Sequence, residues 1–328
     1  MFRLSCKIVI RSNFSAKTIQ FDYVNSIIIS SSTKTFTDTA KIVIPRKLSH
    51  KGVSFTDMIR RNDEIEISLG YDMQLEKVFT GYITKVGTGT PLSIECENAA
   101  WNLKQIKIAP KHYPKLSIQD FVKEWMPSYS CKVAEVDLGE VIIKEESSLA
   151  SVFEYFMKNY PLSFFFRDGV FYGVLTSAMT LSNEAVKTIK FKMGYNVISD
   201  NLVYTLQEDV KIQIVAKAIL ADNTKLEYKV PATGDGEIRT FFKPGAKSID
   251  ELKAFADEML ATYKVDKMSG DFTAFGIPYV RKGDIVHLFD EKFPERNDKK
   301  FVVESVEYNF GLAGYRQKIN LGYELKNG

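Results

Sequence analysis

The chain has 328 residues, 45% of them hydrophobic and 26% charged, an ordinary balance for a globular protein of two or three domains. The formal net charge of +3 is too small to indicate a membrane surface or specific nucleic-acid binding. No run approaches the roughly 18 apolar residues of a membrane span, and no apolar leader precedes Cys6, so neither stable membrane insertion nor a signal peptide is predicted.

Residues 1–105 show the alternation of β-strands almost throughout. Apolar and polar side chains alternate in Leu4–Ile10, Lys17–Tyr23 and Asp63–Tyr71, as they do when one face of a strand is buried. About six such strands are enough to close a small barrel. Gly81 lies inside one of these runs and predicts a bulge or a corner where the strand bends.

Residues 106–200 follow a helical pattern instead. Ser117 and Ser148 each precede a run with apolar side chains at three- and four-residue spacing, which predicts two helices capped by these serines. Asp168-Gly169 lies between two apolar runs and predicts a β-hairpin, because its turn needs positive φ. We therefore expect a small α+β insert domain in this region.

Strand patterns return in residues 201–328. Ser248 and Glu251 form a capping box, which predicts one inserted helix at about 248–264. Three alternating runs then follow between Phe275 and Gly322, and the residues that predict turns or bends before them are Pro278, Gly283 and Asp284.

A short motif occurs twice. Arg60-Arg-Asn-Asp63 and Arg281-Lys-Gly-Asp284 each place two basic residues and a turn residue before an aspartate and a strand. Phe79 follows the first aspartate by 16 residues, and Phe301 follows the second by 17. We interpret this as one β-module used twice; the alternative is that any two antiparallel segments share such turn residues.

The fold class predicted is therefore mainly β with an α+β insert. Two similar β-barrel domains, 1–105 and 201–328, are separated by a small α/β domain, 106–200, and the second barrel contains the helix at about 248–264.

No catalytic constellation is found. The three histidines are isolated and offer no metal-ligand spacing, and no nucleotide-binding or nucleophile motif occurs, so we predict neither an enzyme nor a metal or cofactor. Paired carboxylates leave one alternative open, a carbohydrate-binding or cell-wall-glycan-hydrolysing β-protein. These pairs are Glu64/Glu66, Glu95/Glu97 and Glu145/Glu146, and the histidines are His50, His112 and His287.

Cysteine usage and charge add two expectations. Cys6, Cys96 and Cys131 are far apart and are expected to be reduced, buried thiols of a protein that matures in a cytoplasm. The first sixty residues are locally basic, which suits docking on a charge-complementary neighbour. A charged loop after the strand at 285–289 is a candidate docking surface, with Glu291, Lys292, Arg296, Lys299 and Lys300 as its charged residues.

Taken in order, these motifs resemble the baseplate hub proteins of contractile phage tails. This is the late-control protein D group, with the hub of Mu-like phages and the N-terminal hub part of type VI secretion spikes. Each motif is weak by itself, but their order and spacing cover nearly the whole chain. They are Thr37-Asp-Thr-Ala with the strand ending at Pro45, Asp63–Gly70, Phe79–Ile83, Ser148–Leu175, Gly276–Pro278 with Gly283-Asp284, and Phe301–Gly322.

The resemblance implies a structural role in virion assembly. Such hubs carry two tail-type β-barrels per chain and assemble as homotrimers, so that six barrels form a ring between a hexameric tail tube and a trimeric spike. The partners implied are other copies of the chain, the tube protein, the spike protein, and wedge or tape-measure proteins. The chain would be made in the cytoplasm of a bacterial host and incorporated into the tail baseplate of a phage or prophage, or into a related injection machine. Because it ends soon after the last expected strand, any spike would be a separate protein.

Overall fold

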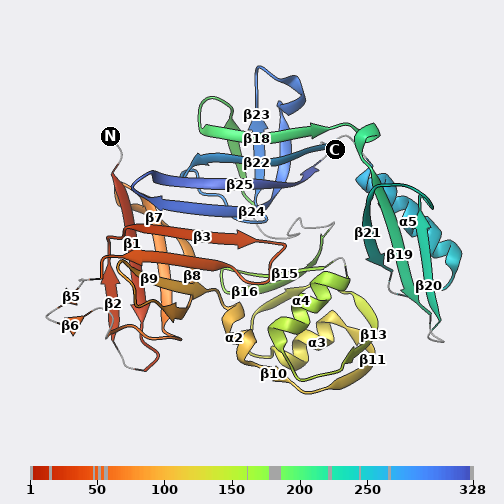
Figure 1. Ribbon diagram of the computed structural model, residues 1–328, viewed down its shortest axis with the longest axis horizontal. Helices are drawn as coiled ribbons and strands as arrows, with labels where there is room; N and C mark the ends of the chain where they lie inside the picture. Colours follow the sequence, from red (N-terminus) through yellow and green to blue (C-terminus); the bar gives the residue numbers. More distant parts are fainter. Residues whose placement is uncertain are drawn as a thin grey trace. The chain divides into compact units, whose positions relative to one another are not determined.

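The computed structural model describes residues 3–14, 17–46, 49–50, 53–54, 58–160, 162–176, 186–220, 224–243, 245–264 and 267–325 (Figure 1). The chain forms two compact units. Unit 1 consists of Met1–Gln105, Thr180–Leu202 and Gly270–Gly328, and unit 2 of Ile106–Met179 and Val203–Ser269. Strands predominate and helices are few, so the predicted class, mainly β with α+β material inserted, is confirmed.

The N-terminal part of unit 1, called here the first module, is built from antiparallel strands. Their side chains alternate between buried and accessible, as in β4, where Ala40, Ile42 and Ile44 are buried. The strands are β1 (Leu4–Arg11), β2 (Thr18–Phe21), β3 (Ser26–Ser32), β4 (Thr39–Ile44), β7 (Glu64–Tyr71), β8 (Gln74–Val86) and β9 (Leu92–Glu97). The short strands β5 (Ser49–His50) and β6 (Val53–Ser54) pair with each other, and helix α2 (Ala100–Gln105) follows β9.

The C-terminal part of unit 1, the second module, repeats this design. It contains β17 (Thr188–Lys192), β18 (Val197–Thr205), β22 (Lys267–Phe275), β23 (Ile285–Phe289), β24 (Lys299–Gly311) and β25 (Gly314–Leu325). The 3-10 turns η2 (Gln207–Asp209) and η3 (Pro294–Arg296) follow β18 and β23.

One sheet of 13 described strands runs through both modules. Its order is β18-β22-β25-β24-β3-β4-β9-β8-β7-β1-β2, with β23 and β17 added beside β24. The two modules meet where β24 pairs antiparallel with β3, from Ser305 opposite Ser32 to Gly311 opposite Ser26 (Figure 1). Within the described strands the order ends at β2 and β18, so closure of either module into a barrel stays a prediction.

The first half of unit 2 packs two helices against small sheets. Ser117 caps α3 (Ile118–Trp125) and Ser148 caps α4 (Leu149–Asn159), each accepting the backbone N–H of the residue three positions on, as predicted. Asp168 and Gly169 both have positive φ in the hairpin turn, also as predicted. The strands are β10 (Lys107–Ile108), β11 (Lys111–Ser117), β12 (Cys131–Val133), β13 (Asp137–Ile143), β14 (Ser147–Ser148), β15 (Leu162–Arg167) and β16 (Val170–Leu175).

A cluster of phenylalanines forms the core of this half. Phe153 of α4 lies 4.9 Å from both Phe164 and Phe171, ring centroid to ring centroid, and all three are fully buried. Contacts of this kind add about 0.5–1.5 kcal/mol per pair beyond the area buried. The aromatic run 164–166 therefore serves the core.

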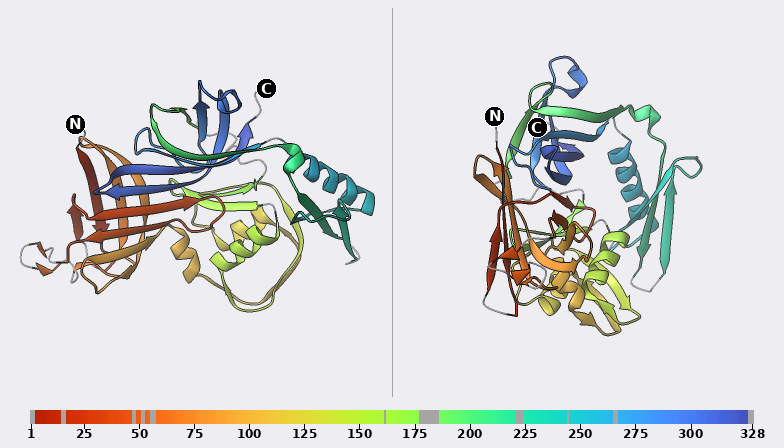
Figure 2. Two further views of the ribbon diagram at one scale, coloured as in Figure 1. Left: turned by 45° about the horizontal axis from the view of Figure 1, so that its top comes forward. Right: turned by 60° about the vertical axis from the view of Figure 1, so that its left-hand side comes forward.

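The second half of unit 2 is a three-stranded sheet covered by one helix. Strand β19 (Ile212–Ile219) lies between β20 (Lys225–Val230), antiparallel, and β21 (Glu237–Phe242), parallel. Ser248 caps α5 (Ile249–Tyr263), as the capping box predicts, and its buried Leu252 and Ala256 pack on Ile214 and Ala216. Both views in Figure 2 show α5 against this sheet.

The units divide the chain differently from the three segments expected from the sequence. Residues 203–269, which the sequence assigns to the second barrel, lie in unit 2, whereas β17 and residues 197–200 of β18, assigned to the insert, belong to unit 1. The division into three domains with boundaries near 105 and 200 stays a prediction. Alternating strands look alike in any sheet, so the local pattern does not say which sheet a strand joins.

Candidate functional site

The twin motifs form two turns with the same hydrogen bonds. In the first, the buried carboxylate of Asp63 accepts the N–H of Arg60 at 2.8 Å, and the N–H of Asp63 donates to the carbonyl of Arg60 at 3.2 Å. Asn62 has φ 74° and its N–H donates to the carbonyl of Ile83, whose own N–H donates to the carbonyl of Asp63. The aspartate thereby closes the turn and aligns it with β8.

The second turn repeats every one of these contacts. The buried carboxylate of Asp284 accepts the N–H of Arg281 at 2.9 Å, and the N–H of Asp284 donates to the carbonyl of Arg281 at 3.0 Å. Gly283 has φ 81°, which favours glycine, and its N–H donates to the carbonyl of Val303 of β24, whose own N–H donates to the carbonyl of Asp284. The duplication inferred from sequence is therefore present at the level of individual hydrogen bonds.

These contacts also correct the alignment of the two copies. Ile83 lies 20 residues after Asp63 and Val303 lies 19 after Asp284, and these two residues are structurally equivalent. Two residues earlier, Gly81 opposite Ile65 matches Phe301 opposite Val286. The expected equivalence of Phe79 with Phe301 is thus wrong by two residues. A phenylalanine at position 81 would not fit, because an added Cβ would lie 2.1 Å from the carbonyl oxygen of Glu97.

The second residue of the turn motif has different surroundings in the two copies. Lys282 is 3% exposed, and its ammonium lies 2.7 and 2.8 Å from the two carboxylate oxygens of Asp38 and 3.3 Å from the carbonyl of Ser32. Arg61, at the same position in the first turn, is exposed and lies 4.9 Å from the ring centroid of Trp101. One basic residue is covered by the neighbouring module and the other is not.

Lys282 and Asp38 form a buried ion pair between the two modules. Such a pair gains little net stability over an apolar one, but loss of one partner leaves an uncompensated charge. Further contacts surround it: the carbonyl of Glu304 accepts both the N–H and the hydroxyl of Thr33, and Tyr71 donates to the carbonyl of Tyr315. Sequence reasoning missed this pair, although Asp38 lies in the Thr37-Asp-Thr-Ala motif and Lys282 in the twin turn.

The predicted turn and bend positions lie at close approaches of the backbone. Gly81 lies between two irregularities of β8, where its register shifts against β7 and against β9. Pro278 follows a cis peptide bond, and its carbonyl accepts the side-chain N–H of the buried Gln317 at 2.6 Å. Gly283 and Asp284 form the second turn described above.

Most charged residues of the predicted docking loop form ion pairs within the same protein chain. Arg296 lies 2.8 Å from Asp200 and 3.1 Å from Asp290, while Glu291 pairs with Lys192 and Lys299 with Glu324, each at 2.7 Å. Lys300 lies opposite His287 in the β23–β24 pair. The side chain of Lys292 is exposed, and docking by this loop stays a prediction.

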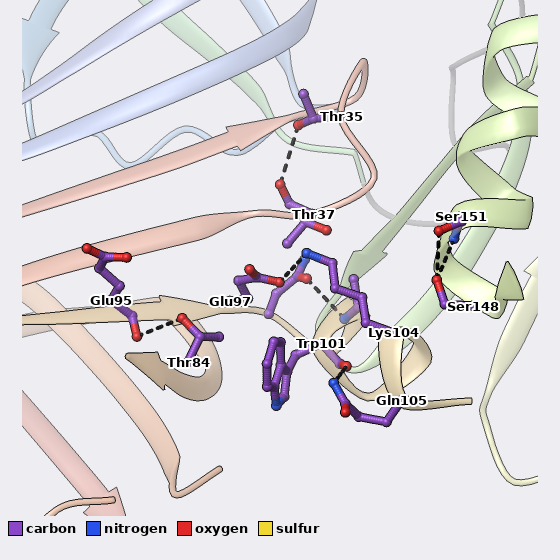
Figure 3. A network of polar contacts seen from close by, with 12 residues as sticks. Thr35, Thr37, Thr84, Glu95, Glu97, Trp101, Lys104, Gln105, Ser148 and Ser151 are labelled. Atoms are coloured by element: carbon purple, nitrogen blue, oxygen red, sulfur yellow. Dashed lines mark hydrogen bonds and ion pairs between the residues drawn. The ribbon is translucent and has the colours of Figure 1, made fainter. Parts of the chain in front are cut away.

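Three of the six paired carboxylates lie beside lysines. Glu97 lies 2.5 Å from Lys104, Glu66 lies 3.5 Å from Lys77, and Glu95 lies 3.6 Å from Lys85. Figure 3 shows Lys104 directed back to Glu97, and Thr84 donating to the carbonyl of Glu95 rather than to its carboxylate. The arrangement offers salt bridges along a strand face rather than an acid and a base on opposite sides of a substrate.

Two histidines pair with acidic side chains. His287 is 9% exposed and its Nε2 lies 2.6 Å from Asp298, while Nε2 of His112 lies 2.8 Å from Glu140. His112 belongs to β11 and lies opposite Ile142 of β13. In the part of the chain that the structure describes, no group of three or more metal-ligating side chains comes together. No helix among the same residues is long and apolar enough to cross a membrane.

All three cysteines are free thiols. Cys6 and Cys96 are buried and Cys131 is half-buried. Burial, with a smaller contribution from Asp22, raises the pKa of Cys6 to about 11, and burial raises the pKa of Cys96 further and that of Cys131 as well. Protonated thiols of this kind are weak nucleophiles.

Similarity to known proteins is confined to structure. No protein-family model and no curated protein matches the sequence. The tail protein from Neisseria meningitidis MC58 is 15% identical with a TM-score of 0.66, and the match covers 98% of this chain and 97% of that one. The 43 kDa tail protein of prophage MuSo2 from Shewanella oneidensis is 12% identical with a TM-score of 0.63, covering 96% and 98%.

A component of a type VI secretion system is also similar. The E. coli c3393 protein, described as similar to the T4 bacteriophage tail proteins gp27 and gp5, is 9% identical with a TM-score of 0.54 over 92% of this chain and 76% of that one. At these identities the likeness establishes the fold. The chain has the fold of phage and prophage tail proteins, as the resemblance in its sequence implies.

Substitution of Asp38 tests the ion pair between the modules. Asp38→Ala leaves the ammonium of Lys282 buried without its carboxylate, and we expect the free energy of unfolding to fall by about 3–5 kcal/mol in urea titrations. Lys34→Ala removes the exposed pair with Glu304 and should cost only about 0–1 kcal/mol. Asp38→Leu combined with Lys282→Met should restore most of the loss. Equal effects of Asp38→Ala and Lys34→Ala would contradict the assignment.

Thiol labelling tests the burial of the cysteines. At pH 8 we expect iodoacetamide to modify Cys131 well before Cys6 and Cys96 in the native protein, because burial holds the latter two protonated and covered. A thiol whose pKa is raised by burial stays protonated in the folded state at pH values where it ionises in the unfolded state. The free energy of unfolding therefore falls as the pH rises above about 8.5, where the unfolded thiols ionise. Peptide mass spectrometry reads the order, and equal native rates for Cys96 and Cys131 would refute it.

Proposed function

We propose that this chain is a structural protein of a phage-type tail or of a related injection machine, acting as a baseplate hub of the late-control protein D type. The observation that carries the proposal is the pair of twin turns in one sheet, because it means that each chain contributes two modules of one design. Three chains would then present six similar modules, which can contact a hexameric tube while the trimer retains the three-fold symmetry of a spike. The work of such a hub is symmetry matching, without catalysis.

The fold supports this role. The two closely matching tail proteins align with nearly the full length of this chain, so the two modules and unit 2 occur together in proteins of that kind. The chain would assemble as a homotrimer and contact the tube protein on one side and the spike protein on the other, with wedge and tape-measure proteins as further neighbours. It would be made in the cytoplasm of a bacterial host and incorporated into a tail baseplate.

The charged loop between β23 and β24 is proposed as part of the docking surface. The equivalent connection in the first module is the two-residue turn Asp72-Met73, so this loop is an addition to the common design. The backbone N–H groups of Asp290 and Lys292 donate to the side chains of Asn297 and Asp290, which orders the loop, and Lys292 remains exposed for a partner. A preordered loop loses less conformational entropy when it binds.

The carbohydrate-active alternative has less support. Glu66, Glu95 and Glu97 each lie within 4 Å of a lysine ammonium. A glycosidase needs two carboxyl groups facing each other about 5–9.5 Å apart across the scissile bond. Measurable lysis of peptidoglycan by the purified chain would revive this alternative.

Assembly of the purified chain tests the proposal. We expect light scattering to give the mass of a trimer at micromolar concentrations, and class averages in electron microscopy to show a three-fold ring with six lobes. A monomer at all these concentrations, or a ring of another symmetry, would overturn the hub.

A charge reversal tests the docking loop. Lys292→Glu should weaken binding to the tube protein of the same machine by about tenfold, because rim charges steer association and can exclude partners of like sign. Lys247→Glu, an equally exposed lysine of unit 2, serves as the control and should bind normally. If both variants bind equally well by surface plasmon resonance, the loop does not dock the tube.

A further inference from the structure

The order of the large sheet reads as the same four-strand series twice. One series is β18-β22-β25-β24 and the next is β3-β4-β9-β8, and they are joined where the last strand of the first series, β24, pairs with the first strand of the second, β3 (Figure 1). The equivalence of β24 with β8 is fixed independently by the twin turns, which bind Val303 and Ile83 in the same way. The sheet therefore contains one junction in which the last strand of one series pairs with the first strand of the next, and we call it the filled junction.

The two strands that would form the next such junction both have an open edge. Strand β18 pairs with β22 on one side only in the described sheet. On the side away from β9, strand β8 pairs with β7 as far as Tyr82 and contacts the turn at Ile83, and no described strand pairs with that side from Thr84 to Val86. In β24 the equivalent stretch begins at Glu304 and carries the contacts with Thr33 and β3.

The side chains of β18 are those expected of a strand edge that another protein surface covers. Its equivalent β3, which has strands on both sides, buries Ile27 and Ile29 completely, whereas none of the nine residues of β18 is buried. Ile198 is 44% and Val203 58% exposed, and Tyr204 is 45% exposed. Apart from Asp200, which pairs with Arg296, the strand has none of the charged residues or prolines that protect a free edge.

Charges on the two sides are complementary. Lys282 of the second turn is buried against Asp38 in the filled junction, while its equivalent Arg61, next to Arg60, is exposed to solvent. The 3-10 turn η2, which follows β18 directly in the chain, carries the exposed acidic residues Glu208 and Asp209. A basic turn at one end of the series thus matches an acidic segment at the other.

We propose that β18 of one copy packs against the end of β8 and the Arg60-Arg61 turn of a second copy, repeating between chains the junction that β3 and β24 form within one chain. This rests on the proposed function and assigns the contact surface of the homotrimer. The two surfaces are different, so the contact is heterologous, and three such contacts close a ring when each turns the next copy by a third of a full rotation. Strand β8 ends three residues after Ile83, whereas β24 continues for eight after Val303. The contact between chains therefore has fewer paired residues along the two strands than the contact within a chain, and it depends more on the side chains of β18.

Two substitutions test the two sides of this contact. Ile198→Lys places a charge on the open edge of β18, and Arg61→Glu reverses the charge of the turn; each should raise the concentration at which half the chains are assembled by about tenfold or more. The controls are Ile142→Lys on β13, where Ile142 is 52% exposed, and Lys123→Glu on α3, where Lys123 is exposed. All four positions are on the surface, and thermal melting followed by circular dichroism checks that each variant folds.

Mixing the two disrupted variants gives the decisive result. Ile198→Lys protein retains an intact turn and Arg61→Glu protein retains an intact β18, so a mixture should form one intact contact and give a 1:1 dimer by mass photometry. Neither variant alone forms it. An interface with the same surface on both sides would not be rescued in this way.

The outcomes separate this inference from the hub itself. A wild-type chain that stays monomeric would refute the homotrimer. If the wild type is trimeric and Ile198→Lys and Arg61→Glu assemble like their controls, the trimer stands and the proposed contact is wrong. If both variants dissociate and the mixture gives no dimer, the head-to-tail pairing is wrong.

Discussion

The buried ion pair of Lys282 with Asp38 constrains the junction of the two modules, where β24 also pairs with β3. Both charges are removed from water, so each is tolerable only while the other lies within hydrogen-bonding distance. The carbonyl of Ser32 accepts a third hydrogen bond from the same ammonium. Because these partners come from the turn before β23 and from the segment between β3 and β4, the pair fixes the register in which β24 lies along β3.

The same turn makes different contacts in the two modules. The aspartate and the left-handed residue before it are needed for the turn itself, so they occur in both copies, as Asp63 with Asn62 and Asp284 with Gly283. The basic residue one position earlier does not shape the backbone and is free to serve contacts. In the second module it is Lys282, in contact with the neighbouring module; in the first it is Arg61, which packs on Trp101 and remains accessible.

The described acidic, thiol and aromatic side chains are largely engaged in ion pairs and packing. Acidic side chains lie against lysines, the two cysteines of the first module are buried, and the large aromatic residues of unit 2 pack on one another. What the surface offers is an open strand edge and an ordered charged loop. Both features suit binding to other proteins.

The sequence by itself determined the local structures. Ser117, Ser148 and Ser248 cap helices, and Asp168-Gly169 forms a turn, because a side chain and a backbone a few residues apart suffice for each. The twin turns belong to the same class. Only the tertiary structure decided which strands pair, placed residues 203–269 in unit 2, and matched Gly81 rather than Phe79 with Phe301. It also brought Lys282 to Asp38, 244 residues away. An alternating strand carries a signal for one buried face but none for its neighbour, so pairing is settled by long-range packing.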